Sequence, residues 1–174
     1  MSCWLLTPIT RLFGRPPDLA IPAKLWHDLL VGLRSRGRGY RESGAFLLGP
    51  HGDPRRVASI VFYDEVDPAA FDTGIIEIDG GRMAELWRIC RERGMVVVAD
   101  VHTHPGGAGQ SESDRMHPII AESGHVAMIL PRFAEEPVIH REIGLYRYLG
   151  RFRWDRLRPS FLKPTLSIGG KIHG

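Results

Sequence analysis

The residues best suited to chemistry are two histidines, His102 and His104, within the segment Asp-Val-His-Thr-His-Pro at 100–105. They follow a nearly continuous apolar run over 95–101, which predicts a strand buried on both faces. Side chains two residues apart on a strand project from the same face, so both imidazoles can approach one ion. Neutral imidazole is a common zinc ligand, and a catalytic zinc needs three protein ligands and an open position. The pair therefore predicts a metal site with a third ligand elsewhere.

Asp114 is the nearest candidate for that ligand. It follows the glycine-rich stretch Pro-Gly-Gly-Ala-Gly-Gln at 105–110, which can fold back because glycine adopts conformations that other residues avoid. The unit Ser111-Glu-Ser-Asp114 is also typical of a helix N-cap, and an isolated pair of histidines at a strand end is often only structural. The interpretation as a metal site depends on both parts occurring together.

Together these residues resemble the JAMM/MPN (JAB) family of zinc metalloproteases. That family carries a motif HxHP, a short loop and then SxxD, with an upstream glutamate in a pattern like ExxGxLLxG. This chain has His-Thr-His-Pro at 102–105, Ser-Glu-Ser-Asp at 111–114, and Glu-Ser-Gly-Ala-Phe-Leu-Leu-Gly at 42–49. The order of the predicted elements is similar to the family over residues 20–150.

The resemblance implies a role for each of these residues. His102, His104 and Asp114 fall on the zinc-ligand positions, Glu42 on the general base, and Ser111 on the hydroxyl that helps to stabilise the tetrahedral intermediate. One departure is that the family usually places seven residues between the second histidine and the serine, whereas six separate them here. The difference lies in the glycine-rich stretch, so it bears on the reach of Ser111 and not on zinc ligation.

The implied activity is hydrolysis of the bond after the C-terminus of a ubiquitin-like protein, as a metallopeptidase or isopeptidase. Zinc activates water and polarises the carbonyl, Glu42 moves the proton to the leaving amine, and Ser111 shares the developing charge with zinc. The expected partner is a ubiquitin-like protein or its conjugate, whose extended tail could add as a strand along residues 71–78. The short interval between Asp114 and His125 favours a compact bacterial member, similar to the deubiquitinase-like proteins of ubiquitin-like conjugation operons.

Other functions fit parts of the pattern. The spacing Asp100-x-His102-x-His104 resembles the DxHxH opening of amidohydrolase barrels, but such a barrel takes roughly 250 residues. Only 74 residues follow Asp100, which excludes it. The JAMM/MPN family also contains non-catalytic scaffold and partner-binding modules, which typically lose zinc ligands that this chain keeps. A DNA-repair-associated JAB-type branch of the family has the same zinc motif, so a function of that kind remains an alternative.

The remaining histidines have no ligand-like spacing to a partner, and we expect them to be hydrogen-bonded or exposed: His27, His51, His117, His125, His140 and His173. Asp100 is expected to support the ligands from behind or simply to end the strand.

Composition limits the class of protein. A chain of 174 residues with 43% hydrophobic and 25% charged residues is typical of one globular domain. The net charge of +3 invites a nucleic-acid interpretation, but the basic residues are spread along the chain, which argues against that partner. Nothing in the sequence indicates the oligomeric state.

The cysteines and apolar runs bear on the compartment. Cys3 and Cys90 have no paired spacing, so neither a disulfide framework nor a thiolate zinc site is predicted. The N-terminal apolar run is too short for a signal-peptide core, and no stretch approaches the roughly 20 apolar residues of a membrane span. These features predict a cytoplasmic protein without a membrane segment.

The elements that must position the site alternate between helix and strand. Apolar spacing predicts helices over 22–36, 83–93 and 115–121, and strands over 42–48, 56–63, 75–78, 95–101, 125–130, 143–149 and 152–154. The alternation predicts an α/β domain with a mixed sheet flanked by helices. The resemblance implies a single JAMM/MPN domain of the cytidine-deaminase-like fold over 1–158, and residues 159–174 are expected to form an irregular tail.

Overall fold

The centre of the structure is a six-stranded mixed sheet in the order β3-β2-β4-β5-β6-β7. Its strands are β2 (Gly44–Pro50), β3 (Ser59–Phe62), β4 (Met95–Thr103), β5 (Val126–Leu130), β6 (Gly144–Gly150) and β7 (Arg153–Arg156). Only β4 and β5 run parallel, and every other neighbouring pair is antiparallel. The structure is a computed structural model that describes residues 16–53, 55–159 and 164–173. The predicted α/β domain with a mixed sheet is confirmed.

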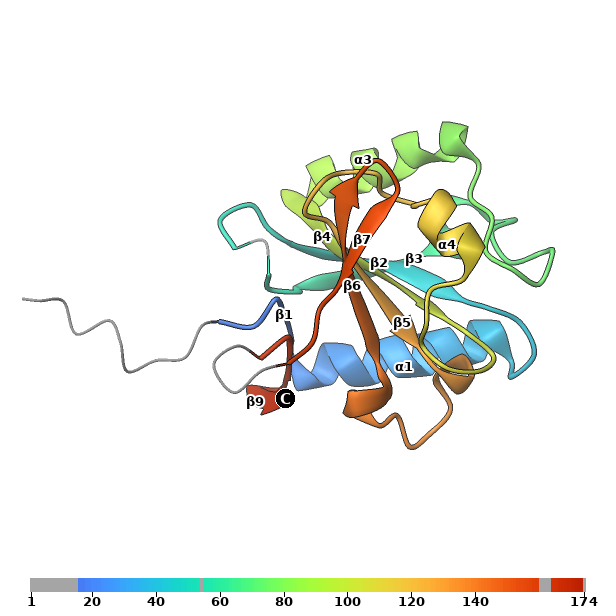
Figure 1. The fold of residues 1–174 in the computed structure, drawn as a ribbon. Coiled ribbons are helices and arrows are strands. Elements are labelled where there is room, and N and C mark those ends of the chain that lie inside the picture. The colour runs from blue at the N-terminus through green and yellow to red at the C-terminus, as the bar shows by residue number, and fades with distance from the viewer. Residues whose placement is uncertain (1–15, 54, 160–163, 174) are drawn as a thin grey trace, which may run out of the picture.

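Two helices cover opposite faces of this sheet, α1 (Ala23–Gly37) on one and α3 (Met83–Arg93) on the other (Figure 1). The shorter helices are α2 (Tyr63–Val66) and α4 (Glu112–Met116), with 3-10 turns at Gly80–Arg82, Arg132–Ala134 and His140–Glu142.

Helix α1 forms because its apolar residues recur at every third or fourth position. Four of these residues, Trp26, Leu29, Leu30 and Leu33, are buried on the face of β4 and β5 that carries Val101 and Met128. Burying one such side chain contributes roughly 1.5–3 kcal/mol before conformational entropy is subtracted. The helix therefore fixes one face of the sheet firmly.

Strand β4 carries the predicted ligands from the middle of the sheet. It is hydrogen-bonded on both edges, to β2 and to β5, so its end has little freedom to move. Ala99 and Val101 face the α1 core, and the alternation of a strand turns Asp100 and His102 to the opposite face. The N–H of His104, just beyond the strand, donates to the Leu130 carbonyl at 2.9 Å.

Three local expectations are wrong. Residues 75–78 form no strand, because the Glu77 N–H donates to the Ala70 carbonyl at 3.1 Å and holds a loop instead. The helix expected over 115–121 lies earlier, at Glu112–Met116, because the side chain of Ser111 caps it. The helical spacing of apolar residues over 83–93 predicts Trp87 on the buried face of α3, but this side chain is 42% exposed.

A second, three-stranded sheet joins the two ends of the described chain. It consists of β1 (Leu19–Ile21), β8 (Leu166–Ile168) and β9 (Lys171–His173), with β1 and β8 parallel. The expected irregular tail is therefore wrong over β8 and β9, because Leu166 and Ile168 are buried in the same core as β1. These strands lie at the end of the molecule remote from α4 (Figure 1).

Two further features concern the compartment. Cys90 is a buried free thiol, and Cys3 lies outside the described residues. Within the described part of the chain, none of the helices has the length and apolar character needed to cross a bilayer.

Candidate metal centre

The structure brings together the three predicted zinc ligands. The Nε2 atoms of His102 and His104 lie 3.0 Å apart. Asp114 contributes Oδ1 at 3.5 Å from the His102 Nε2 and Oδ2 at 3.2 Å from the His104 Nε2. Both histidines are buried, and the three ligand atoms all lie within 4.8 Å of one another.

These distances can be compared with those of a tetrahedral zinc site. Zinc binds imidazole nitrogen and carboxylate oxygen at about 2.0–2.2 Å, so ligand atoms at tetrahedral angles lie about 3.4 Å apart. The observed separations of 3.0, 3.2 and 3.5 Å scatter around that value. Two imidazoles and one carboxylate also match the donor set of many catalytic zinc sites, which keep a fourth position open. The three residues therefore fit a zinc ion.

The glycine-rich loop at 105–110 is held against the sheet. The Tyr146 hydroxyl donates to the Ala108 carbonyl at 2.8 Å, and the Arg132 N–H donates to the Gly106 carbonyl at 3.0 Å. The backbone of Gly109 forms a hydrogen bond with the ring of His104. Such a bond to the far side of a ligand ring fixes its orientation. The loop thus supports His104 directly.

Asp114 reaches the histidines from α4 through a helix cap. Its N–H donates to the Ser111 Oγ at 3.1 Å, and its Oδ2 accepts the Ser111 N–H at 2.6 Å. The interpretation of Ser111-x-x-Asp114 as a capping unit is confirmed, and it is compatible with a metal site because one carboxylate faces the helix start and the imidazoles at once. The reciprocal cap fixes the carboxylate in position.

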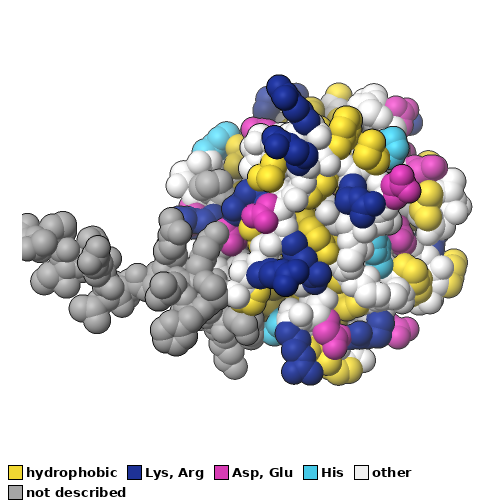
Figure 2. Space-filling model, in the orientation of Figure 1, with side chains coloured by type: hydrophobic (Ala, Val, Ile, Leu, Met, Phe, Trp, Pro, Cys, Tyr) yellow, Lys and Arg dark blue, Asp and Glu magenta, His cyan; other side chains and the backbone are white. Residues whose placement is uncertain are grey.

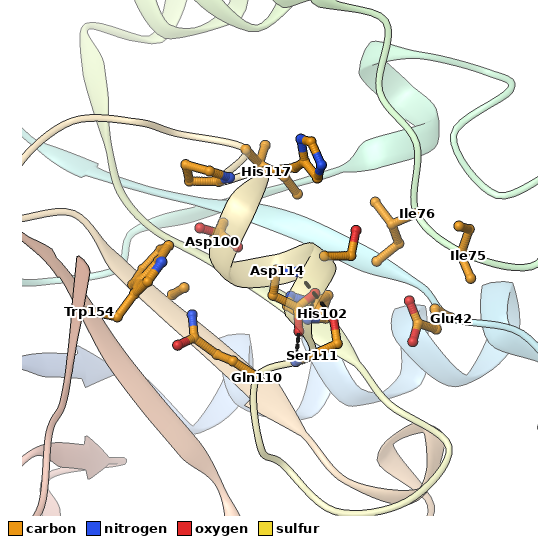
Figure 3. A pocket seen from close by; sticks show the side chains of 14 residues that line it. Glu42, Ile75, Ile76, Asp100, His102, Gln110, Ser111, Asp114, His117 and Trp154 are labelled. Carbon is orange, nitrogen blue, oxygen red and sulfur yellow. Dashed lines mark hydrogen bonds and ion pairs between the residues drawn. The ribbon is translucent and has the colours of Figure 1, made fainter. Parts of the chain in front are cut away.

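Glu42 stands next to the three ligands without joining them. Its Oε1 lies 3.9 Å from the His104 Nε2, and its side chain lies on the opposite side of His102 from Trp154 (Figure 3). The Glu42 N–H donates to the Gly74 carbonyl at 3.1 Å, which ties the residue to the loop before α3. A carboxylate at this separation can accept a proton from a small molecule placed between it and the ligands.

The charges of the cluster shift the pKa values of its members. Burial raises the pKa of Glu42, and the nearby imidazoles of His104 and His102 offset this only in part. Burial also acts to raise the pKa of Asp114, but hydrogen bonds to His102 and His104 outweigh it and lower that pKa strongly. Burial lowers the pKa of His104, whereas its hydrogen bond to Asp114 and the Asp114 charge raise it, and the rise prevails. Asp114 is thus ionised near neutral pH, as a metal ligand must be.

A pocket of about 250 Å³ opens in front of this cluster. Ser111 lines this pocket despite the shorter loop, and its role toward an oxyanion stays a prediction (Figure 3). Ile75 and Ile76 form one wall beside Glu42, and Trp154 and Gln110 form the opposite wall (Figure 3). The remaining lining residues are Asp100, His102, Ser113, Asp114, His117, Pro118, Ile119 and Ala127.

A buried polar network beneath the pocket was not predicted in this form. Asp100 Oδ1 lies 2.5 Å from the His125 Nε2, and its Oδ2 accepts the Tyr63 hydroxyl at 3.2 Å. Burial and the neighbouring Asp100 raise the pKa of Tyr63, so the hydroxyl stays protonated and donates. His125 is hydrogen-bonded, as expected, but its partner comes from another strand and no spacing in the sequence could identify it.

Sequence comparison finds a relative of similar length. The probable metalloprotease y4jG of Sinorhizobium fredii (strain NBRC 101917 / NGR234) is 24% identical over 151 residues, which is 86% of this chain and 93% of the relative. No family model matches the chain.

One solved structure shares the fold. Protein DSY2949 from Desulfitobacterium hafniense is 16% identical with a TM-score of 0.61, over 88% of this chain and 94% of that one. AF2198, a JAB1/MPN domain protein from Archaeoglobus fulgidus, is 16% identical with a TM-score of 0.47, over 86% of this chain and 95% of that one. The motifs, the site geometry that they produce and the similarity to a probable metalloprotease agree, and the predicted resemblance to the JAMM/MPN family is confirmed.

Proposed function

We propose that this chain is a zinc-dependent metallopeptidase of the JAMM/MPN type that cleaves the bond after the C-terminus of a ubiquitin-like protein. One observation carries the proposal. Three ligand atoms from His102, His104 and Asp114 converge within 4.8 Å, and the Glu42 carboxylate stands 3.9 Å from one of them without being a ligand itself. That combination is what hydrolysis by an activated water requires.

The donor set supports zinc as the metal. Two neutral imidazoles and one ionised carboxylate suit a borderline-soft divalent ion better than Mg²⁺ or Ca²⁺, which prefer oxygen ligands. When bound, zinc acts as a Lewis acid that polarises a carbonyl and makes water a stronger nucleophile at neutral pH.

Glu42 and Ser111 have different roles in the proposed reaction. Glu42 accepts the proton of the attacking water and donates it to the leaving amine, a role that a raised carboxyl pKa favours. The Ser111 hydroxyl, whose oxygen already accepts the Asp114 N–H, keeps its own hydrogen free to donate to the developing oxyanion.

The substrate class is supported by the family resemblance and by the shape of the site. The pocket is small, and its apolar wall includes Ile75, which is 54% exposed beside Glu42. An extended, narrow tail can lie along such a wall, whereas a folded domain has to stay outside the pocket. A non-catalytic scaffold role would predict lost ligands, and the complete set counts against it.

The decisive experiment compares two variants of the full chain. Glu42→Gln should keep one zinc per chain by metal analysis and lower kcat by about 10²–10⁴-fold on a fusion in which a reporter follows the C-terminus of a ubiquitin-like protein. His104→Ala should lose both zinc and cleavage.

Three results would contradict parts of the proposal. Unchanged cleavage by Glu42→Gln would contradict the assignment of Glu42 as the general base. Cleavage by zinc-free wild-type protein would contradict the assignment of the chain as a metallopeptidase. Cleavage of unrelated peptides but not of the fusion removes the ubiquitin-like substrate and leaves the zinc chemistry in place.

A further inference from the structure

Strand β7 is an outer strand of the large sheet, and it pairs only with β6. The Leu157 N–H donates to the Leu145 carbonyl at 2.9 Å, so residue 157 points its backbone groups toward β6. Backbone direction alternates along an antiparallel pair, and the N–H and C=O groups of Trp154 and Arg156 therefore point away from β6. Among the described residues, no backbone group hydrogen-bonds to this outer edge.

Arginines cluster along the same edge. Arg151, Arg153, Arg156 and Arg158 are all exposed, and Asp155 is the one acid between them. None of the four forms an ion pair within the described ranges, and with Asp155 as the one acid between them this edge carries an excess of positive charge. Figure 2 shows Lys and Arg side chains spaced over the middle of the face on which β6 and β7 lie.

Charges on an edge strand also discourage pairing between copies of a protein. Acidic side chains, basic side chains or both together would discourage such pairing equally well. The excess of four arginines over one acid is therefore a separate observation, and it favours a ligand of opposite charge.

The edge also lies beside the catalytic pocket, because Trp154 belongs to both. Its ring lines the pocket wall, its Nε1 donates to the Arg115 carbonyl on α4 at 3.2 Å, and its ring centroid lies 4.8 Å from that of Tyr148. The Arg156 guanidinium lies 5.9 Å from the centroid of the Tyr146 ring. A strand added to β7 would pass directly beside the pocket, on the side opposite Glu42 (Figure 3).

We propose that the outer edge of β7 docks an extended acidic peptide segment as an added strand, with its carboxylates against Arg153 and Arg156. The backbone groups of Trp154 and Arg156 supply the main-chain hydrogen bonds, and side chains alternate to the two faces of the added strand. Arg153 and Arg156 lie on opposite faces, so acidic residues on both faces of the peptide are recognised. Unpaired backbone groups favour a peptide over a nucleic acid, which has no strand to add.

Binding of a labelled peptide tests this without requiring hydrolysis. The full-length Glu42→Gln chain is titrated, by fluorescence anisotropy, into a fluorescein-labelled peptide with the sequence Glu-Glu-Val-Val-Glu-Glu-Val-Val-Glu-Glu. We expect saturable binding that weakens at least tenfold with the Gln-for-Glu peptide and at least tenfold in Arg153→Gln/Arg156→Gln. The matched control, Lys24→Gln/Arg91→Gln, removes the same charge from α1 and α3 and should leave the Kd unchanged.

A separate measurement tests whether the peptide backbone forms hydrogen bonds with the outer edge of β7. Two versions of the peptide carry N-methyl groups on alternate residues, in the two possible phases, and at least one phase should lose binding because an added strand uses every second N–H. Equal binding of the Glu and Gln peptides, equal weakening by the control pair, or full binding of both methylated peptides overturns the proposal. Binding of a ten-nucleotide oligouridine in place of the peptide, lost in Arg153→Gln/Arg156→Gln, overturns it in favour of a nucleic-acid surface.

Discussion

The hydroxyl of Thr103 accepts the Ser43 N–H at 3.0 Å, and the Thr103 N–H donates in return to the Ser43 carbonyl at 2.9 Å. Both residues are fully buried. Thr103 lies between the two histidine ligands, and Ser43 follows Glu42, so this reciprocal pair sets the distance between the proposed general base and the metal site.

Thr103→Val should therefore impair catalysis more than metal binding. The substitution leaves the buried Ser43 N–H without its acceptor, which costs about 1–3 kcal/mol, and frees Glu42 to shift. We expect one zinc per chain to remain and kcat to fall about tenfold, because misplacement by a fraction of an ångström reduces proton transfer. Zinc analysis, kcat and urea unfolding check this, with Thr103→Ser as the control that retains the hydroxyl. Loss of zinc with the fold intact would show that Thr103 acts on the ligands instead.

Ser111 and Asp114 share one cap but should differ in their effect on zinc. Ser111→Ala removes the cap oxygen, which costs about 0.5–2 kcal/mol, and removes the oxyanion donor, so kcat should fall about 10²-fold while zinc stays. Asp114→Asn keeps an oxygen for the Ser111 N–H but loses the ligand charge, so zinc should be lost. The unfolding free energy of the metal-free protein should also fall at neutral pH, because the interactions of the carboxylate charge that lower the Asp114 pKa are gone. Metal analysis and urea unfolding of both variants separate the two roles. Zinc loss in Ser111→Ala would contradict this division.

Gly144 on β6 allows the glycine-rich loop to approach the sheet. A Cβ there would lie 2.1 Å from the Ala108 carbonyl oxygen, so Gly144→Ala must displace the loop that orients His104. We expect a loss of about 1–3 kcal/mol in unfolding free energy and weaker zinc retention during dialysis against a chelator. Gly80→Ala is the control, because no atom lies within 4 Å of its added Cβ. Equal behaviour of the two variants would show that the loop adjusts freely.

The site was easier to predict than its supports. His102, His104 and Asp114 lie within a short stretch, where strand periodicity and one glycine-rich loop limit the possible geometries. The contact of Asp100 on β4 with His125, just before β5, joins parts of the chain that are distant in sequence, and no local pattern encodes it. The sequence also does not show which backbone groups will pair with each other. Residues 75–78 have the apolar pattern of a strand, yet the Glu77 N–H donates to the Ala70 carbonyl of a neighbouring loop.

Asp67 should make the loop beside the pocket sensitive to acid. Its carboxylate accepts the Asp79 N–H at 3.0 Å and the Ala69 N–H at 3.1 Å, and these bonds, chiefly that from Asp79, lower its pKa. Since the folded pKa lies below the unfolded value of about 3.9, the carboxylate stabilises the fold fully above that value. The contribution is lost as the pH falls through the folded pKa. Between about pH 5 and about pH 3, Asp67→Asn should lose less unfolding free energy in urea than wild type, and equal losses would contradict the assignment.

The parallel pairing of Leu19 with Leu166 has a consequence for how the chain folds. Strand β1 leads directly into α1, but its partner β8 is synthesised only after the whole of the large sheet. Closing so long a loop is entropically costly and slow, so this pairing should form after the large sheet has assembled. During translation the start of α1 therefore lacks the β1–β8 pairing that holds it in the finished protein. In the folded protein the same β1–β8 pairing should be among the first parts to open, well away from the metal site.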